Sequence, residues 1–357
     1  MRILFGVQGT GNGHITRARI MAKAMAKRSD VEVDFIFSGR DVNGYFDMEV
    51  FGEFRTFQGL SFVTKKGCVN YWQTYRALKL SQFYQDVKSL DLARYDLLLN
   101  DFEPITAWAA KRQKIPSISL SHQAAFVHPI PMQGAGLMDK ILMRYFAPAD
   151  FKLGIHWYHF GFPILPPFID DEHIENVKDK SILVYLPFED VDDIQSALST
   201  FSEYDFVCFH PAIKHAHVND NIVWHAPAKL PFKAALARCR GVIANAGFEM
   251  ASECLHFNKS MLLKPLAGQF EQASNANTLA DLGLCQLMQT LDLEVIEQWL
   301  QFEPSASVQF KSDPNILIDW ILRKKWADTQ GLCSSLWQQV TFPPSVQTSL
   351  RHISLSG

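Results

Sequence analysis

The sequence predicts an α/β protein in which two parallel-sheet domains follow each other along the chain. Apolar runs of strand length alternate with amphipathic stretches of helix length over most of the 357 residues, which is the pattern of right-handed βαβ units. The alternation is interrupted once, by the proline-containing segment 159–171, and then starts again. Since 48% of the residues are hydrophobic, the chain is long enough to bury two cores.

The first predicted domain covers residues 1–163. Short apolar runs predict its strands, and stretches with apolar residues at helical spacing predict the helices between them. The strands are expected at 2–8, 31–37, 95–100, 117–121 and 151–155, and the helices at 14–28, 70–89 and 103–113. Parallel strands joined in this way present their carboxyl ends at one edge of the sheet, where α/β proteins bind ligands.

The second predicted domain covers residues 164–327, and the segment 159–171 is expected to link it to the first. Its strands are expected at 181–186, 206–210, 241–245 and 261–264, and its helices at 189–199, 231–239, 247–256, 270–282 and 315–326. Residues 328–357 are mixed in composition and rich in Ser and Gln, so we expect a loosely packed C-terminal tail. The ligand cleft should lie between the two domains.

The composition excludes several classes of protein. Six cysteines are scattered without a CxxC pair, so neither a disulfide framework nor a zinc site is expected, and three of them (Cys208, Cys239 and Cys254) stand among apolar neighbours as buried thiols. No segment approaches the roughly 20 apolar residues of a membrane span, and the N-terminus does not resemble a signal peptide. A cytoplasmic protein is therefore expected.

Charge is unevenly divided between the two halves. Residues 1–163 carry 20 Lys and Arg against 14 Asp and Glu, whereas residues 164–357 carry 14 against 23. The first half could therefore face an anionic molecule, although an uneven surface charge is common and can have no functional meaning.

A glycine-rich turn, GTGNGHITRAR, follows the first predicted strand. Gly9, Gly11 and Gly13 let a ligand approach the main chain, and the first amides of the next helix favour negative charge. A dinucleotide site fits poorly, because the spacing is GxGxG and a histidine stands where GxGxxG would have its last glycine. Arg40, after the second strand, could hold a 2′-phosphate, so an NADP enzyme stays an alternative.

His14 is predicted to be a general base. In the first turn of a helix the local field disfavours the imidazolium, so the ring should be neutral, as a base requires. A carboxylate should orient the ring, and Asp101 is the first choice because it follows the strand at 95–100; Glu103 is the second choice. Asp101 could alternatively serve only to cap the helix that starts near Pro104.

Two stretches of the second half, GVIANAGFEMASE (241–253) and KPLAGQFEQASNANTL (264–279), resemble the donor-binding signature of the GT-B glycosyltransferases. The resemblance is to the group that contains the bacterial peptidoglycan N-acetylglucosaminyltransferase and the UDP-glucuronosyltransferases, including a set of poorly characterised prokaryotic transferases. The glycine turn matches the acceptor-domain turn of that group, and the likeness extends from Met1 to about Trp326. It implies two Rossmann-like domains facing each other across a cleft.

The resemblance and the chemistry together indicate a donor side. Amides at the start of the helix that follows Asn245 can hold a diphosphate at the positive helix end. In the family, the residue matching Glu253 binds ribose hydroxyls and an acidic-Gln pair contacts the sugar; Glu253 could otherwise be a solvated helix residue. The predicted nucleotide-sugar-binding residues are Asn245, Ala246, Gly247, Phe248, Glu249, Glu253, Gln269, Glu271 and Gln272. Many relatives have Asp where this chain has Glu271, so the sugar stays open.

The acceptor side is expected in the first domain. Its predicted residues are Gly11, Asn12, Gly13, His122 and Gln123, although a packing role for His122 is an equal alternative. The amphipathic segment 136–146 carries Lys140 and Arg144 and could lie on a membrane surface, with core packing as the favoured alternative. Peripheral contact with the inner membrane is thus left open.

The predicted function is a hexosyltransferase-type glycosyltransferase. It would move a sugar from a nucleotide sugar, expected to be a UDP-sugar, to a hydroxyl of a glycan or lipid-linked acceptor. No cofactor or nucleic acid partner is expected. No metal is required either, because helix amides can neutralise the departing diphosphate. The family comparison implies inversion at the anomeric carbon. A UDP-sugar epimerase on the same fold and a non-catalytic nucleotide-sugar-binding protein are the alternatives.

Overall fold

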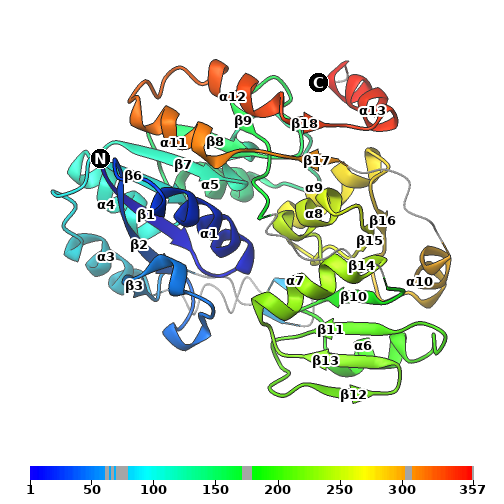
Figure 1. The fold of residues 1–357 in the computed structure, drawn as a ribbon. Helices are drawn as coiled ribbons and strands as arrows, with labels where there is room; N and C mark the ends of the chain where they lie inside the picture. The colour runs from blue at the N-terminus through cyan, green and yellow to red at the C-terminus, as the bar shows by residue number, and fades with distance from the viewer. Residues whose placement is uncertain (61–63, 66–67, 70–78, 171–178, 302–307, 356–357) are drawn as a thin grey trace.

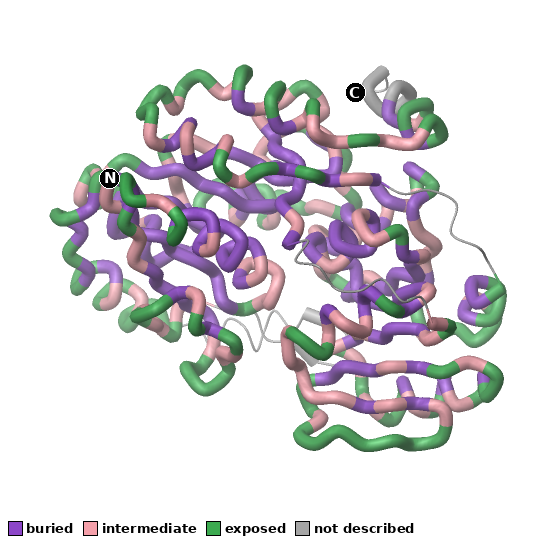
Figure 2. The backbone as a smooth tube through the Cα atoms, in the orientation of Figure 1, coloured by how far each residue is buried: buried purple, intermediate pink, exposed green. Residues whose placement is uncertain are grey.

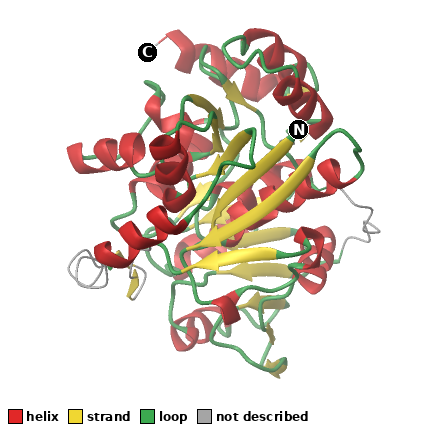
Figure 3. Ribbon diagram, turned by 90° about the vertical axis from the view of Figure 1, so that its left-hand side faces the viewer, coloured by secondary structure: helices red, strands yellow, loops and turns green. Residues whose placement is uncertain are grey.

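Two seven-stranded sheets, one from each half of the chain, form the frame of the protein (Figure 1). The computed structural model describes residues 1–60, 64–65, 68–69, 79–170, 179–301 and 308–355. All strand pairs of the first sheet are parallel, and the second sheet is parallel except for its edge strand β12. Helices flank both sheets (Figure 3), so the expected α/β architecture with two parallel sheets is confirmed.

The first sheet has the strand order β3-β2-β1-β6-β7-β8-β9. Its strands are β1 (Arg2–Gln8), β2 (Glu32–Ser38), β3 (Phe54–Phe57), β6 (Leu97–Asp101), β7 (Ser117–Ser121), β8 (Phe151–Ile155) and β9 (Ile164–Leu165). Its helices are α1 (Asn12–Ala26), α3 (Leu80–Ser89), α4 (Pro104–Gln113) and α5 (Leu137–Tyr145). Successive residues of β1 point to opposite faces: Phe5 packs in the core with α1, and Leu4 packs in the core with α3 and α4.

The second sheet has the strand order β12-β13-β11-β10-β14-β15-β16. Its strands are β10 (Ile182–Tyr185), β11 (Phe206–Phe209), β12 (His217–Asn219), β13 (Ile222–His225), β14 (Gly241–Ala244), β15 (Ser260–Leu263) and β16 (Gln286–Leu287). Its helices are α6 (Val191–Leu198), α7 (Lys229–Arg238), α8 (Phe248–His256), α9 (Phe270–Asp281) and α10 (Leu293–Leu300). In each sheet the strand order reverses beside a central strand, between β1 and β6 and between β10 and β14, which is where such sheets bind ligands.

One apolar cluster joins the two halves. It includes Phe5 and Met21 from the first half and Val242 and Ala251 from the second, and Figure 2 shows buried chain in the strands of both sheets. Trp157, after β8, contributes its indole Nε1, which donates to Ser252 Oγ of α8 at 2.8 Å. The two sheets are therefore held together by packed side chains as well as by the connecting segment.

The C-terminal segment returns to the first sheet. Its elements are β17 (Gln309–Phe310), α11 (Pro314–Leu322), α12 (Gln330–Trp337), β18 (Val340–Thr341) and α13 (Pro344–Leu355). Arg28, which follows α1, donates to Asp319 of α11 at 2.7 Å, and Trp337 Nε1 of α12 donates to the Ile164 carbonyl oxygen of β9 at 2.8 Å. Leu336 is fully buried, so the expectation of a loosely packed tail is wrong.

Most predicted elements lie within a few residues of the observed ones, and the differences have simple causes. The short strands β3, β9, β12, β13 and β16 of the two sheets were not predicted, because two to four residues carry too little pattern. The part of the predicted helix 70–89 at 70–78 lies outside the described residues.

The predicted buried thiols Cys208, Cys239 and Cys254 are buried and free. The domain limits at 163 and 327 stay a prediction; β9 lies just beyond the first. Among the described residues, no helix is long and apolar enough to cross a membrane.

Candidate active site

His14 and Asp101 meet where the strand order of the first sheet reverses. α1 begins at Asn12 after the N-cap residue Gly11, which makes His14 its third residue, and Asp101 is the last residue of β6, next to β1. His14 Nδ1 and Asp101 Oδ1 are 2.7 Å apart. The Asp101 side chain is fully buried and that of His14 is 13% exposed. The predicted partnership is therefore present as a short hydrogen bond.

Glu103 has a different task. Its carboxylate caps α4, accepting from the amides of Ile105 at 2.8 Å and Thr106 at 2.6 Å, and it also accepts from Ser38 Oγ at 2.7 Å. Burial raises the pKa of Glu103 despite these bonds. The prediction that Glu103 could be the partner of His14 is therefore wrong. The alternative that Asp101 serves only to cap α4 is also wrong, because Glu103 is the capping residue.

Arg17 completes a buried cluster with His14 and Asp101 and was not predicted as a site residue. Its Nε donates to Asp101 Oδ2 at 2.8 Å and its Nη2 to Asp101 Oδ1 at 3.1 Å. Burial alone would raise the pKa of Asp101, but the charges of Arg17 and His14 outweigh it and hold that pKa below its usual value. The spacing His14-x-x-Arg17 places both side chains on one helix face, which was the available signal.

The start of α1 lies against the start of α8. Arg17 Nη1 bonds Glu249 Oε1 at 2.5 Å, and a Cβ added at Gly13 would come within 2.9 Å of Glu249 Cγ. The close approach of the two helices therefore requires glycine at position 13. Burial raises the pKa of Glu249 to about 7, although Arg17 opposes the shift.

The rest of the glycine turn is held by Arg40. Its Nη1 donates to Asn12 Oδ1 at 3.1 Å, and its Nε bonds the Gly9 carbonyl oxygen. Asn12 Nδ2 reaches the second half, where it donates to Tyr185 Oη at 3.3 Å. A Cβ at Gly11 would meet no close atom other than the His14 ring, so the turn is open there. Arg40 thus serves the turn and is not presented for a 2′-phosphate.

The predicted diphosphate region lies at the second reversal point, between β14 and α8. Asn245 Nδ2 donates to the Lys264 carbonyl oxygen at 2.8 Å, whereas its buried Oδ1 has no hydrogen-bond partner. The carbonyl oxygen of Ala246 accepts from Asn275 Nδ2 at 3.1 Å, and Gly247 is the N-cap residue of α8. These contacts hold the backbone in place at the start of α8.

Glu253 lies one and a half turns into α8 and is 8% exposed. Burial raises its pKa to about 7; the positive charge of Lys233 opposes the shift and the negative charge of Glu249 adds to it. The alternative of a solvated helix residue is therefore wrong. A buried carboxyl with a raised pKa is suited to a specific polar ligand.

Three of the predicted polar side chains lie at the start of α9. Gln269 is the N-cap residue of α9, and its Oε1 is buried without a hydrogen-bond partner. Glu271 Oε2 accepts from Gln123 Nε2 of the first half at 3.0 Å. Gln272 Oε1 accepts from the amide of Leu266 at 2.8 Å, so its carbonyl oxygen holds the loop and its NH₂ group is the part left for a ligand.

His122 lies in the boundary between the halves. Its ring stacks on Phe248 at 4.0 Å, and its Nδ1 and Nε2 each lie 2.8 Å from an oxygen, of Ile155 and Asn275 respectively. Burial lowers its pKa. Since both ring nitrogens have partners inside the protein, the structure gives His122 the packing role that the sequence left open.

Residues 1–304 match the sequence profile of glycosyl transferase family 1. The chain belongs to this family. No curated protein matches it by sequence. The match covers both sheets and the whole candidate site, so this chain is a glycosyltransferase, and the NADP oxidoreductase alternative is wrong.

Solved structures confirm the GT-B fold for this family 1 glycosyltransferase. The glycotransferase of kitacinnamycin superimposes with a TM-score of 0.55 at 15% identity, over 95% of this chain and 99% of that chain. SsfS6 from Streptomyces sp. SF2575, complexed with thymidine diphosphate, gives 0.56 at 13% identity over 98% of each chain. LpCGTa in complex with UDP gives 0.56 at 13% identity, over 84% of this chain and 90% of that chain.

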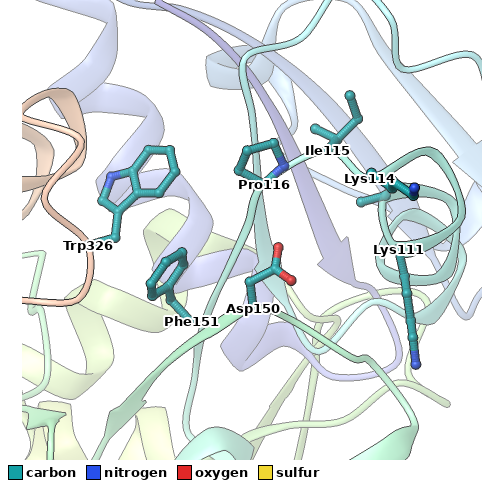
Figure 4. A pocket seen from close by; sticks show the side chains of 8 residues that line it. Lys111, Lys114, Ile115, Pro116, Asp150, Phe151 and Trp326 are labelled. Atoms are coloured by element: carbon teal, nitrogen blue, oxygen red, sulfur yellow. The ribbon is translucent and has the colours of Figure 1, made fainter.

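A separate hollow of about 470 Å³ lies away from this site (Figure 4). Pro116 and Asp150, which line it, directly precede β7 and β8, so the hollow is at the amino ends of these strands. The site of this glycosyltransferase is at the opposite, carboxyl ends. The hollow therefore belongs to the other edge of the first sheet.

Proposed function

We propose that this glycosyltransferase takes its sugar from a nucleotide sugar, specifically a UDP-sugar, and transfers it to an acceptor hydroxyl without a metal ion. The second half binds the donor and the first half binds the acceptor. This division follows from the positions of the two reversal points, one carrying His14 and Asp101 and the other carrying the start of α8.

One observation carries the proposal: the helix that presents His14 touches the helix start proposed for the diphosphate. Gly13 lies against the side chain of Glu249, and Arg17 Nη1 donates to the Glu249 carboxylate. A base and a leaving-group site on opposite sides of one boundary are what a direct displacement needs. Gln123 and Glu271 bond across the same boundary.

The reaction follows from this arrangement. Nδ1–H of His14 donates to Asp101, so Nε2 carries the lone pair and removes the proton of the acceptor hydroxyl. The acceptor oxygen bonds to the anomeric carbon as the bond from that carbon to the β-phosphate oxygen breaks. The electron pair leaves with the nucleoside diphosphate, whose charge the amides at the start of α8 stabilise. A single displacement of this kind inverts the anomeric carbon.

The remaining donor residues have roles that follow from their places. Glu253 would accept hydrogen bonds from the ribose hydroxyls, and Gln269, Glu271 and Gln272 would hold sugar hydroxyls. The resemblance to the peptidoglycan N-acetylglucosaminyltransferase group supports a UDP-sugar, and the complexes of SsfS6 with thymidine diphosphate and of LpCGTa with UDP fit a nucleoside diphosphate.

A ligand panel tests the proposed function. Thermal unfolding of the protein is measured in the presence of UDP, GDP, dTDP, the corresponding nucleotide sugars and NADP. The nucleotide sugars that stabilise the protein are then incubated with glycan and lipid-linked acceptors. Stabilisation by UDP and release of UDP only in the presence of an acceptor are the expected results. Epimerised or hydrolysed donor without transfer would favour the epimerase alternative, and binding without any turnover would favour the sensor.

Glu253→Ala is expected to weaken UDP binding roughly tenfold or more, because the ribose hydroxyls lose a buried carboxyl acceptor. Isothermal titration with UDP measures the change. Glu297→Ala is the matched control, since Glu297 is an exposed glutamate on α10. Equal UDP affinity in the wild type and Glu253→Ala would remove Glu253 from the donor site.

We also propose that α5 lies on an anionic membrane surface that carries the acceptor. Core packing was the favoured alternative for this segment, but it is wrong for the outer face of α5. Four apolar side chains of this helix are exposed: Leu137 (75%), Met138 (75%), Ile141 (42%) and Tyr145 (52%). Lys140 and Arg144 belong to the same helix. An exposed apolar face with basic residues is the composition of interfacial helices.

Vesicle sedimentation tests this surface. The wild type should bind vesicles with anionic lipid more strongly than neutral ones, and Leu137→Ser with Met138→Ser should reduce binding to the anionic vesicles. Leu80→Ser is a control, because Leu80 is an exposed leucine on α3. Unchanged vesicle binding in the double variant would exclude α5 as the membrane contact.

A further inference from the structure

Arg17 is a buried cation that the reaction described above does not use. It is 2% exposed, and two of its nitrogens bond the carboxylate of Asp101. A carboxylate that only orients a histidine needs no guanidinium, and the positive charge of Arg17 works against the imidazolium that forms on His14. The placement of this cation therefore calls for another partner.

That partner lies across the boundary between the halves. Arg17 Nη1 bonds Glu249, the second residue of α8, whose carboxylate thus occupies the anion-favouring start of the helix proposed for the diphosphate. A buried carboxylate and a phosphate oxygen are alternative acceptors for the same guanidinium nitrogen. Glu249 therefore holds the place of an anionic ligand.

We propose that Arg17 binds the β-phosphate of the donor, with its Nη1 moving from Glu249 to a phosphate oxygen when the nucleotide enters. This inference rests on the proposed function and adds a catalytic residue to it. Nε and Nη2 stay on Asp101, so one carboxylate fixes both the base and the ligand of the leaving group. As the bond between the anomeric carbon and the β-phosphate oxygen breaks, the phosphate gains negative charge, which Arg17 stabilises without giving up a proton.

Nucleotide pairs that differ by one phosphate test the inference. UMP and UDP, and dTMP and dTDP, are titrated into the wild type and Arg17→Met. The variant should lose roughly 10- to 100-fold in affinity for the diphosphates and little for the monophosphates. Comparing two ligands in one variant separates a local effect from misfolding, because misfolding weakens both.

Two further variants sharpen the test. Glu249→Gln removes the competing carboxylate and should bind UDP at least as tightly as the wild type. Arg19→Met is the matched control: Arg19 is a buried arginine on the same helix that bonds the Phe46 and Asp47 carbonyl oxygens, so the ratio of UDP to UMP affinity should not change.

The outcomes divide cleanly. Equal loss of UMP and UDP affinity in Arg17→Met, or no loss of either, overturns the inference while leaving the proposed function standing. A wild type that binds neither UDP nor dTDP overturns the inference together with the proposed donor class. Weaker UDP binding in Glu249→Gln would make Glu249 a ligand and not a competitor, which also contradicts the exchange.

Discussion

His14→Ala is expected to lower the rate of sugar transfer by about 100- to 10,000-fold while leaving UDP affinity nearly intact. The variant removes the base that takes the acceptor proton, and His14 belongs to the half of the protein opposite the donor site. Single-turnover rates of transfer and titration with UDP measure the two effects separately. A loss confined to the rate would support the division between an acceptor half and a donor half.

A surface variant and the donor-side variant provide the comparison for His14→Ala. His217→Ala should retain full activity, because His217 is an exposed residue of β12. Glu253→Ala should show the reverse pattern, with weakened UDP binding. If His14→Ala lost UDP binding as strongly as Glu253→Ala does, the proposed division of roles would fail.

The main parts of the site could be predicted because they depend on local pattern. A strand followed by a glycine turn and a helix fixes the place of His14, and a residue directly after a neighbouring parallel strand must reach the same sheet edge. These two rules are enough to pair His14 with Asp101, which the structure shows as a hydrogen bond. The start of α8 follows from the same rule in the second sheet.

Contacts between the halves could not be predicted, because no spacing within the sequence encodes them. Arg17 and Glu249 are 232 residues apart, and their bond depends on how α1 meets α8. Glu103, and not Asp101, caps α4. The two residues are only two positions apart, and a predicted helix start is uncertain by about as much, so the sequence could not distinguish them. His122 was assigned to the acceptor side by position alone, but its stacking on Phe248 fills the boundary.

The C-terminal segment shows a different limit. Helix α11 was predicted at 315–326, whereas α12 falls in the segment expected to be a loose tail, and nothing in the composition of either helix indicates that they pack on the first sheet. Residues after the predicted second domain therefore pack against the first sheet, through contacts such as the hydrogen bond from Trp337 Nε1 to the Ile164 carbonyl oxygen of β9. A prediction that divides the chain into consecutive domains cannot represent a C-terminal segment that returns to the first sheet.

Asp101→Asn is expected to reduce both transfer and stability. The transfer rate should fall roughly 100- to 10,000-fold, because a neutral amide does not stabilise the imidazolium of His14. The free energy of unfolding should fall by about 3–5 kcal/mol, because the variant removes the charge of the carboxylate that two nitrogens of the buried Arg17 guanidinium contact and leaves Glu249 as the charged partner of Arg17. Urea unfolding monitored by fluorescence measures the second effect.

The double variant Asp101→Asn with Arg17→Met separates the two consequences. Removing both charges should make the double variant more stable than the sum of the two single changes predicts, since neither charge is then left without its partner. The double variant also removes Arg17 from Glu249. Because burial raises the pKa of Glu249 to about 7 even against the charge of Arg17, Glu249 can take up a proton at about pH 6, so the gain in stability should be largest at this pH. Activity should not return, because the base has lost its charged partner. Additive destabilisation would show that Asp101 and Arg17 act independently, and recovered transfer would remove Asp101 from the reaction.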